Sequence, residues 1–259
     1  MKLIKNIVKQ IVGRFGYEIR FKLQDKRIDL PYIDLHQFLS VYFIHKNLDD
    51  FFFVQVGAND GKTGDPVFPF VQQYSVSGLL LEPQPLVFEA LKENYEGQEQ
   101  LIFENVALGK TEGEMMLYQV SDDIKSVYDA AVPGNTTGIA SFDKTHIERQ
   151  LKKNIPTYLD KPIDHYIKSE AVPTRPFNTL FDTHGITRVD LLQIDTEGYD
   201  YVILQQFFEN CDFLPDIINY ESFNMSFEEQ EACAEMLRSK GYALFNHAKN
   251  DTCAYRIKL

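Results

Sequence analysis

The chain has 259 residues, 44% of them hydrophobic and 25% charged, which is the ordinary balance of a globular protein with a sizeable core. Its net charge of −12 argues against nucleic acid as the main partner. The three cysteines are widely spaced, which predicts neither a zinc site nor a disulfide framework, and no apolar run approaches a membrane span of about 18–20 residues. We therefore expect a cytoplasmic protein built as one large α/β domain or two small ones.

Residues 1–48 are predicted to form a helical arm ahead of the main domain. Apolar residues recur at helical spacing over residues 1–20, with basic residues on the other faces, which is the pattern of an amphipathic helix. A second helix is predicted over residues 35–46. Residues 1–28 hold eight Lys or Arg and two acids, so this acidic protein begins with a basic segment. We expect residues 1–20 to pack on the domain or on a second subunit, and a peripheral membrane contact is the alternative.

Residues 49–259 are predicted to form the main domain, because apolar strands alternate with helices as in a mostly parallel sheet. The predicted strands are 51–56, 78–82, 101–106, 189–194 and 215–221, and the predicted helices are 66–74, 84–95, 199–209 and 226–239. Two closing strands, 242–247 and 252–258, form a terminal hairpin. A loosely alternating strand over 114–120 leads into residues 121–170, whose polar residues and prolines predict an insertion that acts as a lid.

A glycine loop, residues 57–61 (GANDG), follows the first strand, and the second strand ends in Glu82. Glycines let a ligand approach the backbone, and an acid at the tip of the neighbouring strand accepts ribose hydroxyls. A dinucleotide site needs G-x-G-x-x-G so that a pyrophosphate can lie on bare backbone, but Asn59 occupies the central glycine position here. The loop therefore predicts a nucleoside ligand without phosphates, and S-adenosylmethionine (SAM) is that ligand.

Four segments in this order resemble the FkbM family of SAM-dependent methyltransferases: residues 55–61 (QVGANDG), 81–83 (LEP), 105–109 (NVALG) and 190–199 (DLLQIDTEGY). The resemblance covers roughly residues 50–259. It implies a Rossmann-like class I methyltransferase fold, with a seven-stranded, mostly parallel sheet, an antiparallel terminal hairpin and helices on both faces. It also implies methylation of hydroxyls on sugars or other metabolites.

The predicted SAM site follows the ends of the strands. Asn105 and Ala107 lie at the end of the third strand, where the adenine should lie, and Ser141 belongs to a segment that in this family lies close to the cofactor. Ser141 could instead cap a helix. Gln55 stands where related enzymes often have an acid, and its amide can hydrogen-bond the SAM ammonium group without forming an ion pair. The full set is Gln55, Gly57, Asn59, Asp60, Gly61, Glu82, Pro83, Asn105, Ala107, Ser141 and Asp195.

The predicted catalytic residues are Asp195, Glu197 and Glu221, which follow or end neighbouring strands. An alcohol is a poor nucleophile until its proton leaves, and a carboxylate within about 2.6–3.2 Å of the hydroxyl can take that proton. Asp195 could instead bind the cofactor ammonium, and Glu197 could cap the next helix. The three acids could also hold a divalent metal, but acids at separate strand ends are a weak metal signal and no metal ligand is predicted.

The sequence thus predicts a SAM-dependent O-methyltransferase acting on a hydroxyl of a sugar, glycan precursor or related metabolite. The acceptor class comes from the resemblance alone. A catalytically idle SAM-binding partner protein is one alternative, and a nicotinamide-dependent oxidoreductase is a less favoured one. His146 and His165 lie in the insertion, where we expect surface histidines; bases in a lid are the alternative.

Overall fold

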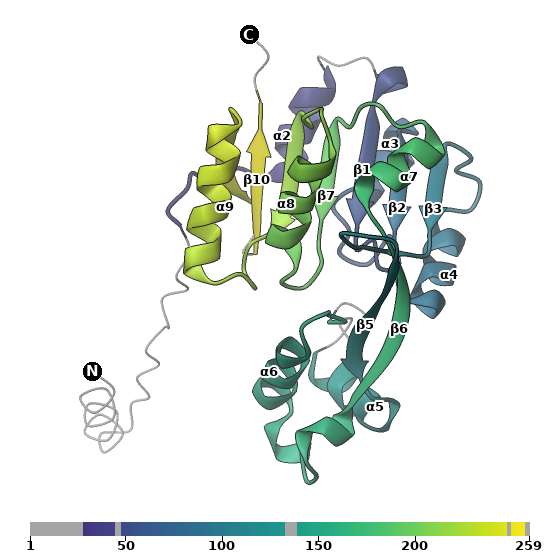
Figure 1. Cartoon of the computed structure of the whole chain (residues 1–259), viewed down its shortest axis with the longest axis vertical. Coiled ribbons are helices and arrows are strands. Elements are labelled where there is room, and N and C mark those ends of the chain that lie inside the picture. The colour runs from purple at the N-terminus through teal and green to yellow at the C-terminus, as the bar shows by residue number, and fades with distance from the viewer. Residues whose placement is uncertain (1–27, 45–47, 133–138, 248–249, 257–259) are drawn as a thin grey trace.

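The computed structural model describes residues 28–44, 48–132, 139–247 and 250–256. The amphipathic helix expected over residues 1–20 lies outside the described residues. Figure 1 shows a sheet covered by helices on both faces and a smaller helical unit carried on a long two-stranded ribbon. Within the described ranges no helix is long and apolar enough to cross a membrane.

The main sheet has seven strands in the order β3-β2-β1-β7-β8-β10-β9. Strands β1 (Phe52–Val56), β2 (Ser77–Leu81), β3 (Leu101–Glu104), β7 (Leu191–Ile194) and β8 (Ile217–Glu221) are parallel. Strands β9 (Ala243–His247) and β10 (Asp251–Tyr255) form an antiparallel hairpin, and β10 pairs antiparallel with β8. The fold class predicted from the sequence is confirmed.

Helices cover both faces of this sheet because its central strands are apolar on both sides. Phe53 and Leu80 pack toward α2 (Leu35–Ile44), α3 (Phe68–Tyr74) and α4 (Pro85–Asn94). The adjacent residues Val54 and Leu79 pack toward α7 (Phe177–His184), α8 (Asp200–Asn210) and α9 (Phe227–Ser239). A short 3-10 helix, Leu48–Asp50, precedes β1. Two buried apolar layers therefore fix the position of each strand.

The register of the parallel strands determines where the predicted site residues lie. Val56 at the end of β1 pairs with Leu81 of β2 and with Ile194 of β7. The residues that follow these three strand ends, Gly57, Glu82 and Asp195, consequently emerge at one edge of the sheet. This carboxyl edge is where ligands bind in open α/β sheets.

A second, three-stranded sheet leaves that edge, in the order β4-β6-β5. Strands β5 (Gly113–Val120) and β6 (Ile167–Arg175) form the antiparallel ribbon, and β4 (Ala107–Leu108) pairs with the base of β6. The ribbon carries residues 121–166, here called the helical lobe, with α5 (Asp122–Ala131), α6 (Lys144–Asn154) and 3-10 helices Pro156–Tyr158 and Ile163–Tyr166.

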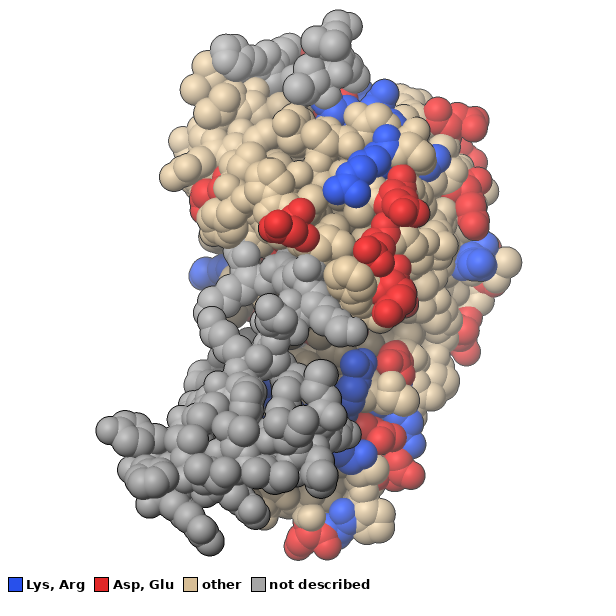
Figure 2. Space-filling view, turned by 90° about the vertical axis from the view of Figure 1, so that its left-hand side faces the viewer, with Lys and Arg blue, Asp and Glu red and all other residues tan. Residues whose placement is uncertain are grey.

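The helical lobe differs from the expectation for residues 121–170 in two ways. It has a core of its own, in which Ile124, Tyr128, Ile139, Ile147, Leu151, Ile155 and Tyr166 are buried together with Val120 at the end of β5. Residues 167–170 belong to β6, a strand that sequence patterning did not predict, and α7 was also not predicted. Pro173 interrupts the β6 pattern, since proline cannot donate a ladder hydrogen bond. In the space-filling view, Lys and Arg side chains lie among Asp and Glu on both parts of the molecule (Figure 2).

Candidate active site

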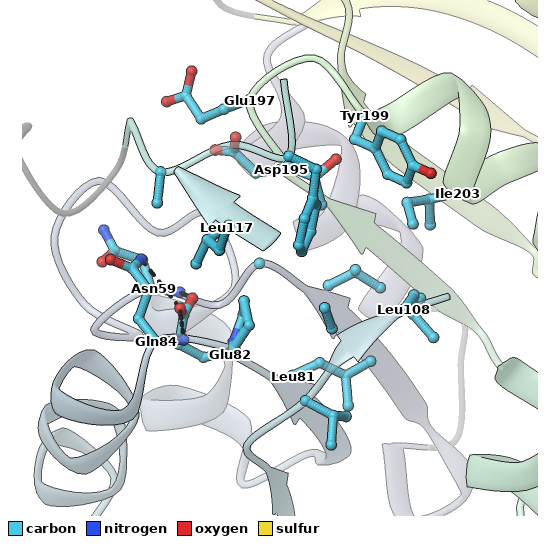
Figure 3. Close-up of a pocket in the computed structure, with 18 of the residues that line it drawn as sticks. Asn59, Leu81, Glu82, Gln84, Leu108, Leu117, Asp195, Glu197, Tyr199 and Ile203 are labelled. Atoms are coloured by element: carbon cyan, nitrogen blue, oxygen red, sulfur yellow. Dashed lines mark hydrogen bonds between the residues drawn. The ribbon is translucent and has the colours of Figure 1, made fainter. Parts of the chain in front are cut away.

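A pocket of about 250 Å³ opens at the carboxyl edge of the main sheet. Its walls come from the loops after β1, β2 and β7, from β4 and β5, and from residues 140 and 142 of the helical lobe. Figure 3 shows Glu82 with Asn59 and Gln84 at one side of it and Asp195 with Glu197 at another. Of the residues predicted from the sequence, the pocket is lined by Gly57, Asn59, Glu82, Pro83, Ala107, Asp195 and Glu197.

Gly57 brings the loop after β1 against the loop after β7. Its φ is +77°, and a Cβ atom built there would lie 1.9 Å from the carbonyl oxygen of Asp195. The N–H groups of Gly57 and Ala58 both donate to the carbonyl oxygen of Leu81, at 3.0 and 2.9 Å. Only glycine fits this position, because both the backbone angle and the close approach exclude a side chain.

Glu82 is 3% exposed and its carboxylate accepts three hydrogen bonds. Oε2 accepts from the N–H of Asn59 at 2.9 Å, and Oε1 accepts from the N–H and Nε2 of Gln84 at 2.9 and 3.2 Å. Burial outweighs these hydrogen bonds and raises the pKa of Glu82 to about 7. The carboxylate retains acceptor capacity for a ligand. The Oδ1 atom of Asn59 is buried without a partner among the described residues, so this wall offers a second acceptor.

The Asp195 side chain is exposed on the side that faces the pocket, and protein atoms surround its other sides. Its carboxylate has no hydrogen bond or ion pair with any of the residues that the structure describes. Desolvation in the cleft, then repulsion from Glu221 and Glu197, raises its pKa well above that of an ordinary aspartate. A carboxylate in that setting holds a proton more readily than one on the surface.

Glu197 is held from two directions. Its backbone lies in the left-handed region, at a φ of +52°, and its carbonyl oxygen accepts from Oγ of Ser141 at 3.2 Å. Its Oε2 accepts from Nδ2 of Asn224 at 2.9 Å and lies 3.3 Å from Nε2 of His146. Ser141 and His146 belong to the helical lobe, so the lobe fixes the loop that carries the predicted acids.

The two histidines of the helical lobe have different environments. His146 is only 2% exposed, so the expectation of a surface histidine is wrong for this residue, and its Nε2 lies 3.3 Å from Oε2 of Glu197. His165 is a surface histidine, with a side chain that is 39% exposed and lies 3.3 Å from Asp123.

Glu221 does not join the pocket wall. It is 8% exposed, and its Oε2 accepts from the same Asn224 amide at 2.8 Å. Burial, then repulsion from Glu197 and Asp200, raises the pKa of Glu221 to about 9. The predicted rim of three acids is therefore two acids facing the pocket and one behind them.

Asp200 connects the loop after β7 to β8. Its carboxylate accepts from Oγ1 and N–H of Thr196, at 2.8 and 3.3 Å, and from the N–H of Glu221 at 3.0 Å. Burial raises the pKa of Asp200 to about 6. This fully buried residue shapes the loop, and sequence reasoning did not select it.

Two further predicted cofactor residues lie behind the pocket. Gln55 is buried, and its Nε2 donates to Oδ2 of Asp65 at 2.8 Å. Position 55 thus holds an amide, and the carboxylate of Asp65 lies directly beside it. Asn105 donates from Nδ2 to the carbonyl oxygen of Glu82 at 2.7 Å. Both residues stabilise strand ends and neither lines the pocket.

The remaining predicted residues, Asp60, Gly61 and Ser141, shape the loops around the pocket. Asp60 accepts from the N–H groups of Lys62 and Thr63 at 3.0 and 2.8 Å, which closes the turn. Gly61 lies where a Cβ atom would be 2.3 Å from the Leu91 side chain, so it permits packing against α4. Ser141 acts on Glu197, as described above.

The sequence comparison with protein families decides the identity. The methyltransferase FkbM domain matches residues 55–244. The chain belongs to the FkbM methyltransferase family. It is accordingly a SAM-dependent methyltransferase, and the predictions of family, enzyme class and organic cofactor are confirmed.

Similar solved structures are distant. An FkbM methyltransferase from Methylobacillus flagellatus KT is 12% identical, with a TM-score of 0.47; the match covers 82% of this chain and 45% of that one. The S-adenosylhomocysteine (SAH)-bound methyltransferase PaMTH1 of Podospora anserina is 9% identical, with a TM-score of 0.41 and coverages of 92% and 83%. A Methanococcus jannaschii fibrillarin pre-rRNA processing protein is 12% identical, with a TM-score of 0.38 and coverages of 81% and 68%. Likenesses this weak carry no argument about the acceptor. No curated protein sequence matches the chain at a significant level.

Sequence reasoning on this FkbM methyltransferase missed four residues that build the site, Gln84, Thr196, Asp200 and Asn224, and it favoured a surface position for His146. Gln84, Thr196 and Asp200 stand close in sequence to the predicted residues Glu82, Asp195 and Glu197, but their residue types alone gave no signal. Asn224 gave no signal, and the burial of His146 was not expected, because both residues reach Glu197 only through the fold. In the described ranges no group of three or more His, Cys, Asp or Glu side chains is placed to hold a metal.

Proposed function

We propose that this FkbM methyltransferase transfers the SAM methyl group to a hydroxyl oxygen of a sugar, glycan precursor or related metabolite, with Asp195 as the base. The Asp195 carboxylate carries the proposal: it faces the pocket, and its pKa is raised. SAM supplies an electrophilic methyl carbon and leaves as SAH when the carbon–sulfur bond breaks. Asp195 takes the hydroxyl proton as the new carbon–oxygen bond forms, which contributes about 10²–10⁴-fold to such reactions.

The wall around Glu82 supports the placement of the nucleoside. Its carboxylate already accepts three hydrogen bonds, so it has capacity for one ribose hydroxyl, on Oε2, and the unpartnered Oδ1 of Asn59 accepts from a further donor of the ligand. Val106, Leu108 and Ile203 supply an apolar surface for the base in the same pocket. With the nucleoside held at this wall, the methionine end of SAM would extend toward Asp195, which lines another side of the same pocket.

Sugars are proposed as acceptors because the four sequence motifs resemble a family that usually methylates such hydroxyls. Glu197 and the helical lobe, beside Asp195, lie where the acceptor would approach. Cys211, Cys233 and Cys253 are free thiols, which suits the reducing cytoplasm that we propose as its location.

The test is turnover with isotopically labelled SAM on a panel of sugars, nucleotide sugars and glycan precursors, with the methylated atom assigned by NMR. We expect a methyl ether, with turnover about 10²–10⁴-fold slower in Asp195→Asn and unchanged in the exposed control Asp212→Asn. Unchanged turnover in Asp195→Asn would refute its role as base. A methyl group found on nitrogen or carbon would refute the reaction type, and SAM binding without turnover on the whole panel would favour the idle partner protein.

A further inference from the structure

A second cavity, of about 460 Å³, adjoins the first across Glu197. It lies between α6 of the helical lobe and the loop that joins β8 to α9. Among the residues that the structure describes, Glu197 is the one that lines both cavities. A group entering from the second cavity thus reaches the acids after β7 from the side opposite to the nucleoside wall. No part of the proposed cofactor site occupies this cavity.

One face of α6 lines the second cavity with polar side chains. His146, Arg149, Gln150 and Lys153 stand at helical spacing i, i+3, i+4 and i+7, and all four belong to its wall. The opposite face of α6 places Ile147 and Leu151 in the core of the lobe. A helix face that packs on protein is usually apolar, whereas the face of α6 toward this cavity is polar.

The acids of the cavity wall are already engaged. Both oxygens of Asp143 accept from Oγ1 of Thr145, at 2.7 Å each, and Glu229 accepts from the N–H of Ser226 at 2.8 Å in a helix cap. Arg149 reaches Asp143 only at 3.7 Å, as an exposed pair. Such pairs contribute little. The Nε atom of Arg149 donates to the carbonyl oxygen of Thr145 at 3.3 Å, which leaves the two terminal nitrogens of the guanidinium available to an anion.

Lys153 is the second exposed cation of this wall, and the structure gives it no ion pair or hydrogen bond within the described ranges. Together, the two cations form a pair at the outer part of the α6 face, four residues apart. Phe223, 38% exposed, supplies an apolar surface on the other side of the cavity.

We propose that the second cavity is the acceptor site and that Arg149 and Lys153 bind an anionic group, a phosphate or a carboxylate, carried by the acceptor. This inference rests on the proposed function, since it gives the acceptor of that reaction a charge. An α-helix rises about 1.5 Å per residue, so these side chains start about 5–10 Å along α6 from His146, which contacts Glu197. The acceptor therefore carries its anionic group about that far from the hydroxyl that is methylated.

The experiment measures anion binding and needs no turnover. Inorganic phosphate and acetate are titrated separately into the labelled full chain bound to SAH, at constant ionic strength, and the amide resonances of Gly198 and Asn224 are followed by NMR. We expect saturable shifts with at least one of the two anions, and the stronger one identifies phosphate or carboxylate as the group bound. Binding should weaken at least about tenfold in the double variant Arg149→Ala/Lys153→Ala.

The matched control is Lys152→Ala, because Lys152 lies on the same helix, pairs with Glu148 at 3.1 Å and does not line the cavity. This variant should bind the anion as the unaltered chain does, and all variants should bind SAH equally. The proposal fails if neither anion gives saturable shifts, if the double variant binds as well as the control, or if the acceptor found by turnover is uncharged. Methylation of nitrogen would refute the proposed function and leave this binding result standing.

Discussion

Cofactor binding should depend on pH through Glu82, because burial holds the pKa of this carboxyl at about 7 in the free protein. Ribose hydroxyls donate hydrogen bonds, and the ionised carboxylate is the better acceptor, so ligand binding favours the ionised form. Below pH 7 the protonated group must lose its proton as the ligand binds, and above pH 7 it is already ionised. Affinity for SAH should therefore rise with pH through about 7 and then level off.

The size of the effect follows from the pKa. A group with a pKa of about 7 is about nine-tenths protonated at pH 6, so affinity at pH 6 should be about tenfold lower than at pH 8, or about 1.4 kcal/mol. Glu82→Ala removes a ligand hydrogen bond to a charged acceptor, worth about 1.5–3 kcal/mol, so it should weaken binding at pH 8 at least tenfold. Glu82→Gln keeps the size of the side chain and removes the titration.

Calorimetric titration with SAH at pH 6 and pH 8, in two buffers of different ionisation enthalpy, measures both affinity and proton release. The control is Glu89→Gln, which alters an exposed acid on α4 that pairs with Lys92. Equal affinity at the two pH values in the unaltered protein would refute the argument. If Glu82→Gln kept the full pH dependence, the titrating group would have to be sought among the other acids with a raised pKa, Asp195 and Asp200 first.

Three further changes test the architecture of the site. Gly57→Ala should abolish SAH binding measured by calorimetry. The control Gly97→Ala has a similar φ of +84° but nothing within 4 Å of the new Cβ, so it should cost only about 1–2 kcal/mol of stability. Equal losses of binding in the two variants would contradict the clash argument. His146→Gln should lower kcat with little change in the KM for SAM, because it frees Glu197. The surface change His165→Gln should leave both constants unaltered. A raised KM for SAM with an unchanged kcat in His146→Gln would contradict this role. Asp200→Ala leaves buried donors unsatisfied and should lower the free energy of unfolding in urea by about 1–3 kcal/mol or more; an unchanged value would show that water replaces the carboxylate.

The sequence by itself determined the main sheet and the three residues at its centre. Each central strand is a short apolar run next to a glycine or an acid, and parallel strands that start from equivalent core positions end at one edge. Gly57, Glu82 and Asp195 were therefore found from local pattern alone, and the register of Val56 with Leu81 and Ile194 brings them together. The ordered motifs were also specific enough to indicate the FkbM family, which the family comparison confirmed.

Only the tertiary structure decided which polar side chains face the pocket and which support it. Glu221 and Gln55 have the residue types and strand positions of site residues, yet each turns to a partner behind the wall. His146 meets Glu197 across 51 residues of sequence, because the ribbon of β5 and β6 places α6 over the loop after β7. Secondary structure is a local property, so the spacing of apolar residues predicts it. A buried polar side chain instead pairs with whichever group the packed chain brings within hydrogen-bonding distance.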